Sequence, residues 1–163
     1  MMTFNLEPGI QRPSKILVAV DGSETSMNAA DYAITLAQNN NNSNIATEVI
    51  VINVIDLPPI FKMLPSETRK QLIIIGRQQA SQIFDAIDEI AKRHDATNLK
   101  IFKEMVETSS ASAADGMIKY AKEKGVDLIV VGTKGKSGMS KALLGSVASK
   151  VVTYSPCSVL VVR

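Results

Sequence analysis

Residues 127–162, DLIVVGTKGKSGMSKALLGSVASKVVTYSPCSVLVV, decide the fold of this chain. They begin with a short apolar run (127–131), pass through a polar stretch that contains glycines, and continue with apolar residues at helical spacing. A second apolar run (158–162) ends the stretch. Runs of this kind are typical of strands buried on both faces. Two such strands joined by a helix predict a parallel β-α-β unit with a right-handed crossover.

The rest of the chain repeats this alternation of strand and helix. Strands are predicted at residues 15–20, 47–55 and 99–106. Helices are predicted after the first strand, at residues 67–94, and from Ser109 or Ser110 to Gly125. The order β-α-β-α-β-α-β-α-β predicts one doubly wound α/β domain over residues 15–163, with helices on both faces of a parallel sheet. Residues 1–14 show no periodicity and are predicted to be an irregular lead-in.

Three local predictions depend on single patterns. The polar stretch QNNNNSN at 38–44 is expected to end the first helix and form a loop. The long helix is expected to bury one apolar stripe, and His94 at its end is expected to be solvated. The stripe comprises Leu72, Ile75, Ile83, Ala86, Ile87, Ile90 and Ala91.

Composition excludes several functional classes. The chain has 163 residues, one cysteine, one histidine and a net charge of +2. These counts exclude a disulfide framework, a cysteine-based zinc cluster and a histidine-rich metal site, and they argue against a Ser-His-Asp hydrolase. No apolar run reaches the roughly 18 to 20 residues of a membrane span, and the first residues do not resemble a signal peptide. We therefore expect a soluble, cytoplasmic protein.

Charge is distributed unevenly along the chain. Residues 119–150 carry seven lysines but only Glu123 and Asp127 as acids. This excess is compatible either with a solvated lysine-rich surface or with an anion site. Motifs have to decide between the two.

The polar stretch Gly132-Thr-Lys-Gly135, followed after nine residues by Gly145-Ser146, is the strongest motif. Glycines allow positive φ and a close approach of the backbone to an anion, and a helix N-terminus presents unpaired N–H groups suited to phosphate. The alternative is a glycine-rich turn without a ligand. A Walker A loop fails because Val130 stands where its first glycine belongs, and a Rossmann fingerprint fails because DGSETS follows the first strand.

The stretch GTKGKSGMSKALLGS resembles the G-x2-G-x9-G-[ST] motif of the nucleotide-binding branch of the universal stress protein family. ILVAVDGSETS, DLIVVGTKGKSG and SPCSVLVV resemble further segments of that family, so that the similarity spans about residues 14–163. Many members have histidine where this chain has Lys134. The resemblance implies a five-stranded parallel sheet in the order 3-2-1-4-5, with a crevice where the carboxyl ends of strands one and four meet.

Carried over residue by residue, the resemblance implies an adenine-nucleotide site. Asp21 would accept hydrogen bonds from the ribose, although it could instead cap the first helix. Val54 would meet adenine through its backbone, and Ala19 would lie beside the base. The implied site comprises Ala19, Asp21, Val54, Gly132, Thr133, Lys134, Gly135, Lys136, Ser137, Gly145, Ser146 and Val147.

The resulting expectation is a stress-response regulator or adaptor that binds ATP or AMP, with Mg²⁺ or Mn²⁺ held mainly through the phosphates. Hydrolysis is expected to be slow or absent, because no acidic residue and no histidine lies between Asp127 and Arg163. The alternatives are a nucleotide-independent dimeric interaction module and, with less support, an adenine-nucleotide enzyme, for which the HxGH and SGGxDS motifs are missing. A homodimer is expected through the charge-free strand Ser158 to Val162, which the implied order places at the edge of the sheet.

Overall fold

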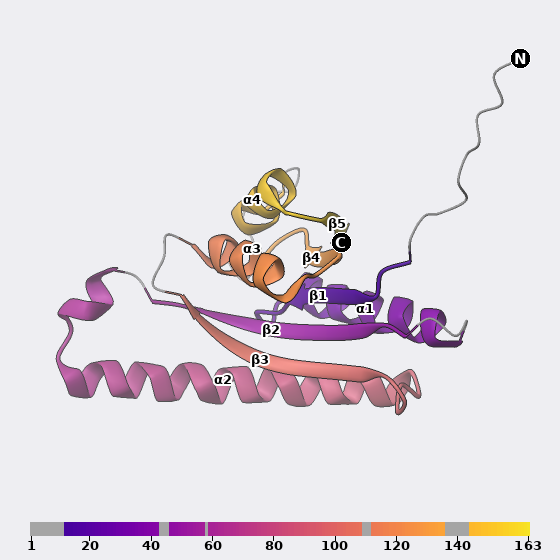
Figure 1. Cartoon of the computed structure of the whole chain (residues 1–163). Coiled ribbons are helices and arrows are strands. Elements are labelled where there is room, and N and C mark those ends of the chain that lie inside the picture. Colours follow the sequence, from indigo (N-terminus) through magenta and orange to yellow (C-terminus); the bar gives the residue numbers. More distant parts are fainter. Residues whose placement is uncertain (1–11, 43–45, 58, 109–111, 136–143) are drawn as a thin grey trace, which may run out of the picture.

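The computed structural model describes residues 12–42, 46–57, 59–108, 112–135 and 144–163. Five strands alternate with four α-helices and one short 3₁₀-helix (Figure 1). The strands are β1 (Lys15–Ala19), β2 (Glu48–Asp56), β3 (Lys100–Thr108), β4 (Leu128–Gly132) and β5 (Ser158–Val162). The helices are α1 (Glu24–Asn42), η1 (Pro59–Met63), α2 (Ser66–Arg93), α3 (Ala113–Lys124) and α4 (Ser146–Tyr154).

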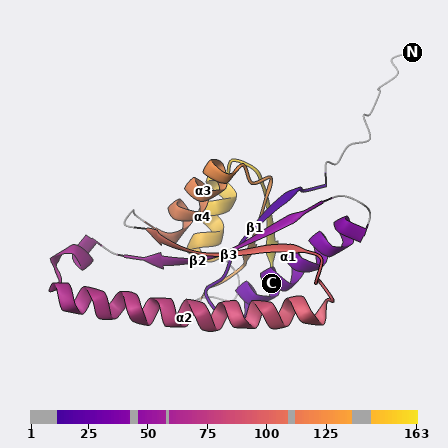
Figure 2. The ribbon, with the colours of Figure 1, turned by 60° about the horizontal axis from the view of Figure 1, so that its bottom comes forward.

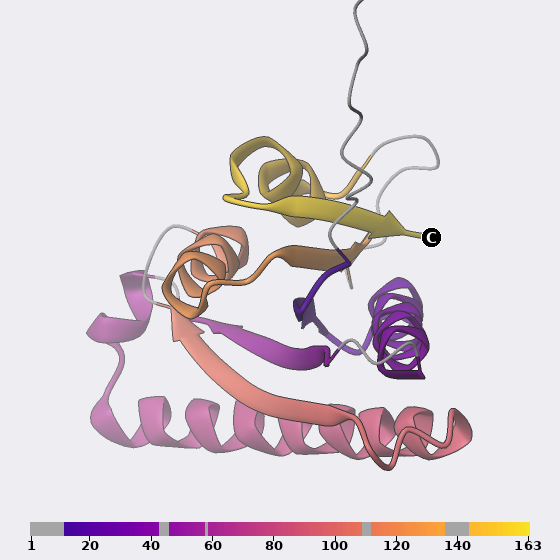
Figure 3. The ribbon, with the colours of Figure 1, turned by 45° about the vertical axis from the view of Figure 1, so that its right-hand side comes forward.

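All strand pairs are parallel, in the order β3-β2-β1-β4-β5, which confirms the predicted fold class. Helices α1 and α2 cover one face of the sheet, and α3 and α4 cover the other (Figures 2 and 3). Each face has its own apolar core, because successive strand residues point to opposite sides. Ile16 and Val18 belong to the core under α1 and α2, whereas Leu17 belongs to the core under α3 and α4.

Helix α1 is longer than predicted, because it continues through the asparagine-rich stretch to Asn42. Two of these asparagines, Asn40 and Asn41, bond to segments outside the helix. Asn40 is buried, and its Nδ2 donates to the carbonyl of Pro13 and to Thr47 Oγ1. Asn41 Oδ1 accepts a hydrogen bond from the amide of Thr47. The predicted loop at 38–44 was therefore wrong over its first five residues.

Helix α2 is buried along only part of its predicted stripe. Its second half packs on the sheet through Ala80, Ile87 and Ile90, whereas Leu72 and Ile75 in the first half remain 45% and 49% exposed. The first half lies with η1 at the far end of the molecule from α1 (Figures 1 and 2), so α1 does not cover it. The apolar periodicity identified the helix, but it does not predict how much of the helix the rest of the protein covers.

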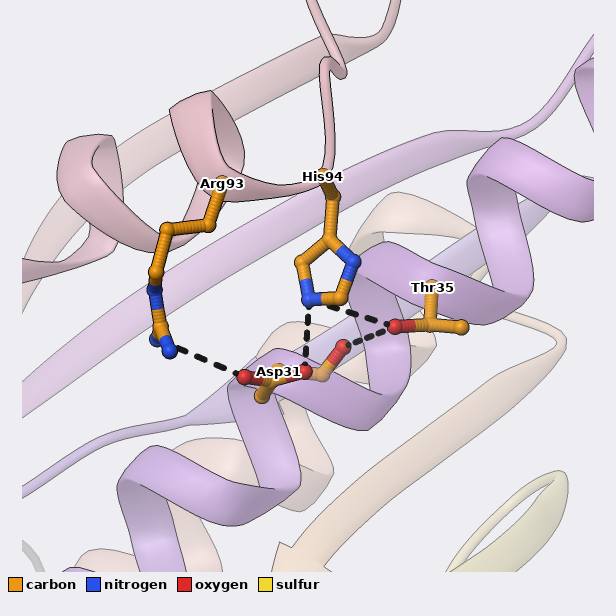
Figure 4. Close-up of polar contacts among 4 residues, drawn as sticks. All are labelled: Asp31, Thr35, Arg93 and His94. Carbon is orange, nitrogen blue, oxygen red and sulfur yellow. Dashed lines mark hydrogen bonds and ion pairs between the residues drawn. The ribbon is translucent and has the colours of Figure 1, made fainter.

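His94 joins α2 to α1, and its side chain is not simply solvated (Figure 4). Its Nε2 lies 2.7 Å from Asp31 Oδ1 and 3.5 Å from Thr35 Oγ1, while Arg93 lies 3.5 Å from Asp31 Oδ2. Both contacts of His94 use the same ring nitrogen, whereas a catalytic relay needs one contact at each nitrogen. The cluster therefore fastens two helices and does not form a nucleophilic triad.

The ends of α3 agree with general capping rules. Gly125 ends the helix in the left-handed region at φ 63°, as predicted. The N-cap is Ser112, whose side chain accepts from the amide of Asp115, so that the proposed caps Ser109 and Ser110 were wrong. Those two serines lie outside the described residues. In the part of the chain that the structure describes, no helix is both long and apolar enough to cross a membrane.

Candidate functional site

A cleft opens at the carboxyl ends of β1 and β4, where the order of the sheet reverses. It contains about 700 Å³ of empty space, a figure that includes open solvent at its mouth. Its lining comes from β1, β2, β4, the loops that follow them, and the first turns of α1, α3 and α4. The lining residues are Ala19, Val20, Asp21, Ser26, Val54, Ala113, Met117, Val131, Gly132, Thr133, Lys134, Gly135, Gly145, Ser146, Val147 and Ala148.

Asp21 occupies the wall of the cleft that belongs to β1. Its Oδ1 accepts hydrogen bonds from the amide of Ser23, at 2.9 Å, and from Ser23 Oγ, at 2.6 Å. Ser23 precedes α1, and its own Oγ accepts from the amide of Ser26. Ser23 therefore takes the capping role that was the alternative for Asp21, and the Asp21 carboxylate lies beside the cleft.

The end of β4 and the loop after it are pressed against α1 and Asp21. A Cβ at Gly132 would lie 2.7 Å from the backbone of Thr25, so this position requires glycine, whereas a Cβ at Gly135 would lie 2.9 Å from Asp21 Oδ2 and would displace that side chain. Thr25 Oγ1 also donates to the carbonyl of Lys134. The spacing of these two glycines is therefore explained by contact with the first helix and with Asp21.

The far side of the cleft is the N-terminus of α4. Gly145 is the N-cap, its amide donates to the carbonyl of Thr133 at 2.7 Å, and no side chain among the described residues caps the helix. Its φ of −61° is open to any residue, so positive φ does not explain this glycine. A Cβ there would instead lie 3.3 Å from Thr133 O and 3.5 Å from Lys134 Cα. Ser146 follows as the first helical residue, in the turn whose N–H groups have no partner within the helix.

Comparison with known proteins agrees with this geometry. The model of the universal stress protein family matches residues 13–163.

This chain belongs to the universal stress protein family.

Among its relatives is a universal stress protein of Methanocaldococcus jannaschii, MJ0531, with 37% identity over 149 residues, 91% of this chain and 81% of that protein. The solved structure of the universal stress protein UspA from Lactobacillus plantarum has a TM-score of 0.75 and 25% identity, covering 93% of this chain and 99% of that one. Another universal stress protein, solved in complex with cAMP, has a TM-score of 0.64 and 25% identity, covering 93% and 98%.

In this universal stress protein the structure brings ten of the twelve predicted site residues to one cleft. The other two, Lys136 and Ser137, lie outside the described residues. Sequence reasoning missed the contribution of α3, because Ala113 and Met117 were not considered as site residues. Both lie near the start of a helix that follows a strand, which in a doubly wound fold places them at the carboxyl ends of the strands, and this could have identified them.

The cleft of this family member has one apolar part and one polar part. The apolar part is lined by side chains without polar atoms, apart from the Met117 thioether, which come from β1, β2, β4, α3 and α4. The polar part contains Asp21, the loop after β4, and Gly145 and Ser146 at the start of α4. The apolar part consists of Ala19, Val54, Ala113, Met117, Val131 and Ala148. Among the residues with described positions, no group of three or more His, Cys, Asp or Glu side chains could hold a metal ion.

Proposed function

We propose that this universal stress protein binds an adenine nucleotide, ATP or AMP, in the cleft and acts as a nucleotide-dependent regulator or adaptor in the stress response. One observation carries the proposal: residues from segments more than 110 positions apart line a single cleft that pairs an apolar part with a helix N-terminus. A planar base fits the first part and an anionic phosphate fits the second. The cAMP complex of a similar family member supports adenine as the base.

The proposed pose assigns a role to each part of the cleft. The base would lie against Ala19 and the backbone of Val54, and the ribose hydroxyls would donate to Asp21. The loop from Gly132 to Ser137 would follow the ribose and the phosphates, with Lys134 and Lys136 adding positive charge. Gly145, Ser146 and Val147 would hold the phosphates at the start of α4. Mg²⁺ or Mn²⁺ would be carried by the phosphates themselves.

Little or no ATP hydrolysis is part of the proposal. Asp21 is the only acidic residue among those described that line the cleft, and one oxygen of its carboxylate already accepts two hydrogen bonds from Ser23. A residue placed on the ribose does not reach a water that attacks the last phosphate, as a general base must.

The test compares thermal unfolding of the protein alone, with AMP and with ATP. A ligand present at 100 times its dissociation constant adds about 2.7 kcal/mol to stability, so binding raises Tm clearly. Mass spectrometry of nucleotide released from protein purified without added ligand then identifies the resident species. Unchanged Tm with both nucleotides, and no nucleotide released, would overturn the proposal in favour of a nucleotide-independent module.

We also propose a homodimer through β5. This strand forms an edge of the sheet, has no charged residue, and is half-buried from Val159 to Val162. The exposed side chains of Val152 and Tyr154 extend apolar surface onto the neighbouring α4. Antiparallel pairing of two β5 strands across a two-fold axis would satisfy both edges.

Light scattering is expected to give a mass near twice 17.6 kDa. Leu160→Lys or Val161→Pro should shift it towards the monomer. Phe102→Lys on the opposite edge strand, β3, serves as the control and should leave the mass unchanged. A monomeric wild-type protein at high micromolar concentration would overturn the dimer.

A further inference from the structure

A small polar network joins α3 to α4 beside the cleft. Lys150 Nζ lies 2.7 Å from Asp115 Oδ2 and 3.3 Å from Ser112 Oγ. Ser112 Oγ in turn donates to Asp115 Oδ2 at 2.9 Å. Among the described residues, these contacts of Lys150 are the only polar side-chain links between α4 and either α3 or its N-cap.

The network fixes the turn of α3 that lines the apolar part of the cleft. Ser112 is the N-cap of α3, Asp115 lies in its first turn, and Ala113 and Met117 between and after them contribute to the lining. Lys150 lies one turn after Ser146 on α4. The network therefore ties the apolar wall to the helix whose N-terminus forms the polar part.

Lys150 links two helices, which separates it from Lys119, whose ion pair with Glu123 stays within α3. Its side chain is 36% exposed and that of Asp115 is 33% exposed, so that the pair is only partly solvated. The hydrogen bond from Lys150, together with that from Ser112, holds the pKa of Asp115 below its ordinary value. By contrast, Lys119 Nζ and Glu123 Oε1, both on α3, lie 3.8 Å apart, and their side chains are 76% and 61% exposed.

We infer that Lys150 and Asp115 are positioning residues that hold the α3 wall against the base of the bound nucleotide. This inference rests on the proposed nucleotide binding. The place of Lys150 in the lysine-rich segment suggests a phosphate ligand. The inference assigns it a different role. A positioning role acts on the base, and all adenine ligands share the base. A phosphate contact acts only on ligands that carry phosphate, and its effect grows with their charge.

Calorimetry with adenosine, AMP and ATP on the full-length protein distinguishes these roles. Lys150→Met and Asp115→Asn should weaken all three ligands by the same factor, about tenfold, the scale of one charge-assisted hydrogen bond. Lys119→Met is the matched control, because it removes one exposed lysine charge from α3 without touching the network; it should leave all three affinities unchanged. Asp115→Asn keeps the shape of the side chain, so that it remains informative if Lys150→Met does not fold.

The charge-reversed double variant Lys150→Asp, Asp115→Lys supplies a readout that a loss of stability alone would not produce. It should recover part of the affinity lost in either single reversal, since the link between the helices is restored. A loss that rises from adenosine to ATP would overturn the inference by making Lys150 a phosphate ligand. Unchanged affinities in both single variants would overturn it while leaving nucleotide binding intact. A wild-type protein that binds none of the three ligands would overturn the proposed function as well.

Discussion

The two ends of the sheet are built in different ways. At the amino end, side chains close the structure: the carboxylate of Asp127 accepts hydrogen bonds from the amide and hydroxyl of Ser14 and from the amide of Lys15, more than 110 residues away. Buried Asn40 adds a bond to Thr47 nearby. At the carboxyl end, glycine-containing loops leave a cleft between β1 and β4.

Because of this difference, we expect the amino end to contribute to folding stability and the carboxyl end to contribute to ligand binding. Polar groups at the amino end bond to one another, so their removal costs folding free energy. At the carboxyl end, the N–H groups at the start of α4 lie beside the cleft, and no side chain in the described part of the chain caps them. We therefore expect matched substitutions at the two ends to act on two different measurements.

The largest contrast is expected between two glycines. Gly145→Val should abolish detectable ATP binding, because its branched side chain meets the carbonyl of Thr133 at the mouth of the phosphate site. Gly125→Val at the amino end forces a branched side chain into the left-handed region, at a cost of roughly 1–2 kcal/mol in unfolding free energy, and should leave ATP affinity unchanged. Calorimetry and urea unfolding measure the two effects. ATP binding that survives in Gly145→Val would contradict the phosphate assignment.

The second contrast uses two aspartates. Asp21→Ala should weaken ATP and adenosine alike, by about 1.5 to 3 kcal/mol for a charged acceptor. Asp127→Ala should instead lower the unfolding free energy by about 1.5 kcal/mol, the lower end of the same range, because its contacts are exposed. If Asp21→Ala lowered the unfolding free energy and left ATP affinity unchanged, Asp21 would have a structural role like that of Asp127 and no role in binding.

The third contrast uses two serines and is the smallest of the three. Ser146→Ala should weaken ATP by roughly 0.5 to 1.5 kcal/mol, the net contribution of one hydrogen bond, and should spare adenosine. Ser14→Ala removes the hydroxyl that donates to Asp127 at 2.7 Å, and should change only the midpoint of unfolding. Equal losses for ATP and adenosine in Ser146→Ala would contradict its place at the phosphates.

Much of the carboxyl end could be predicted from the sequence because its chemistry is local. Glycine spacing, a strand before it and a helix after it predict a phosphate loop within about 20 residues. The sequence did not reveal the reason for each glycine: Gly132 avoids Thr25 and Gly135 avoids Asp21, and both neighbours lie more than 100 residues away. The resemblance to the family, and not the spacing, brought Asp21 to this loop.

The amino end and the helical layers were less predictable because they depend on packing between distant segments. Nothing in QNNNNSN indicates that Asn40 finds partners in Pro13 and Thr47, so a helix ending seemed the simplest interpretation. The exposure of Leu72 likewise does not follow from its place in the apolar stripe. Periodicity reports which face of a helix is apolar, but the neighbour that covers that face is set by the fold.

The fourth prediction concerns the pH dependence of stability at Asp115, whose network with Lys150 and Ser112 lies beside the cleft. The hydrogen bond from Lys150, followed in size by that from Ser112, lowers the pKa of Asp115 in the folded protein. The ionised carboxylate therefore stabilises the fold at pH values above the ordinary aspartate pKa of about 3.9. That contribution is lost as the pH falls through the lowered pKa of the folded state. The difference in unfolding free energy between wild type and Asp115→Asn should thus be constant from pH 7 to about 5 and shrink below about 4. Urea unfolding at pH 6, 5, 4 and 3 measures it, with Lys119→Met as a control for general charge effects. A difference that grows as the pH falls would show that the protonated form of Asp115 is the stabilising one, and would remove the ion pair with Lys150 as the link between α3 and α4.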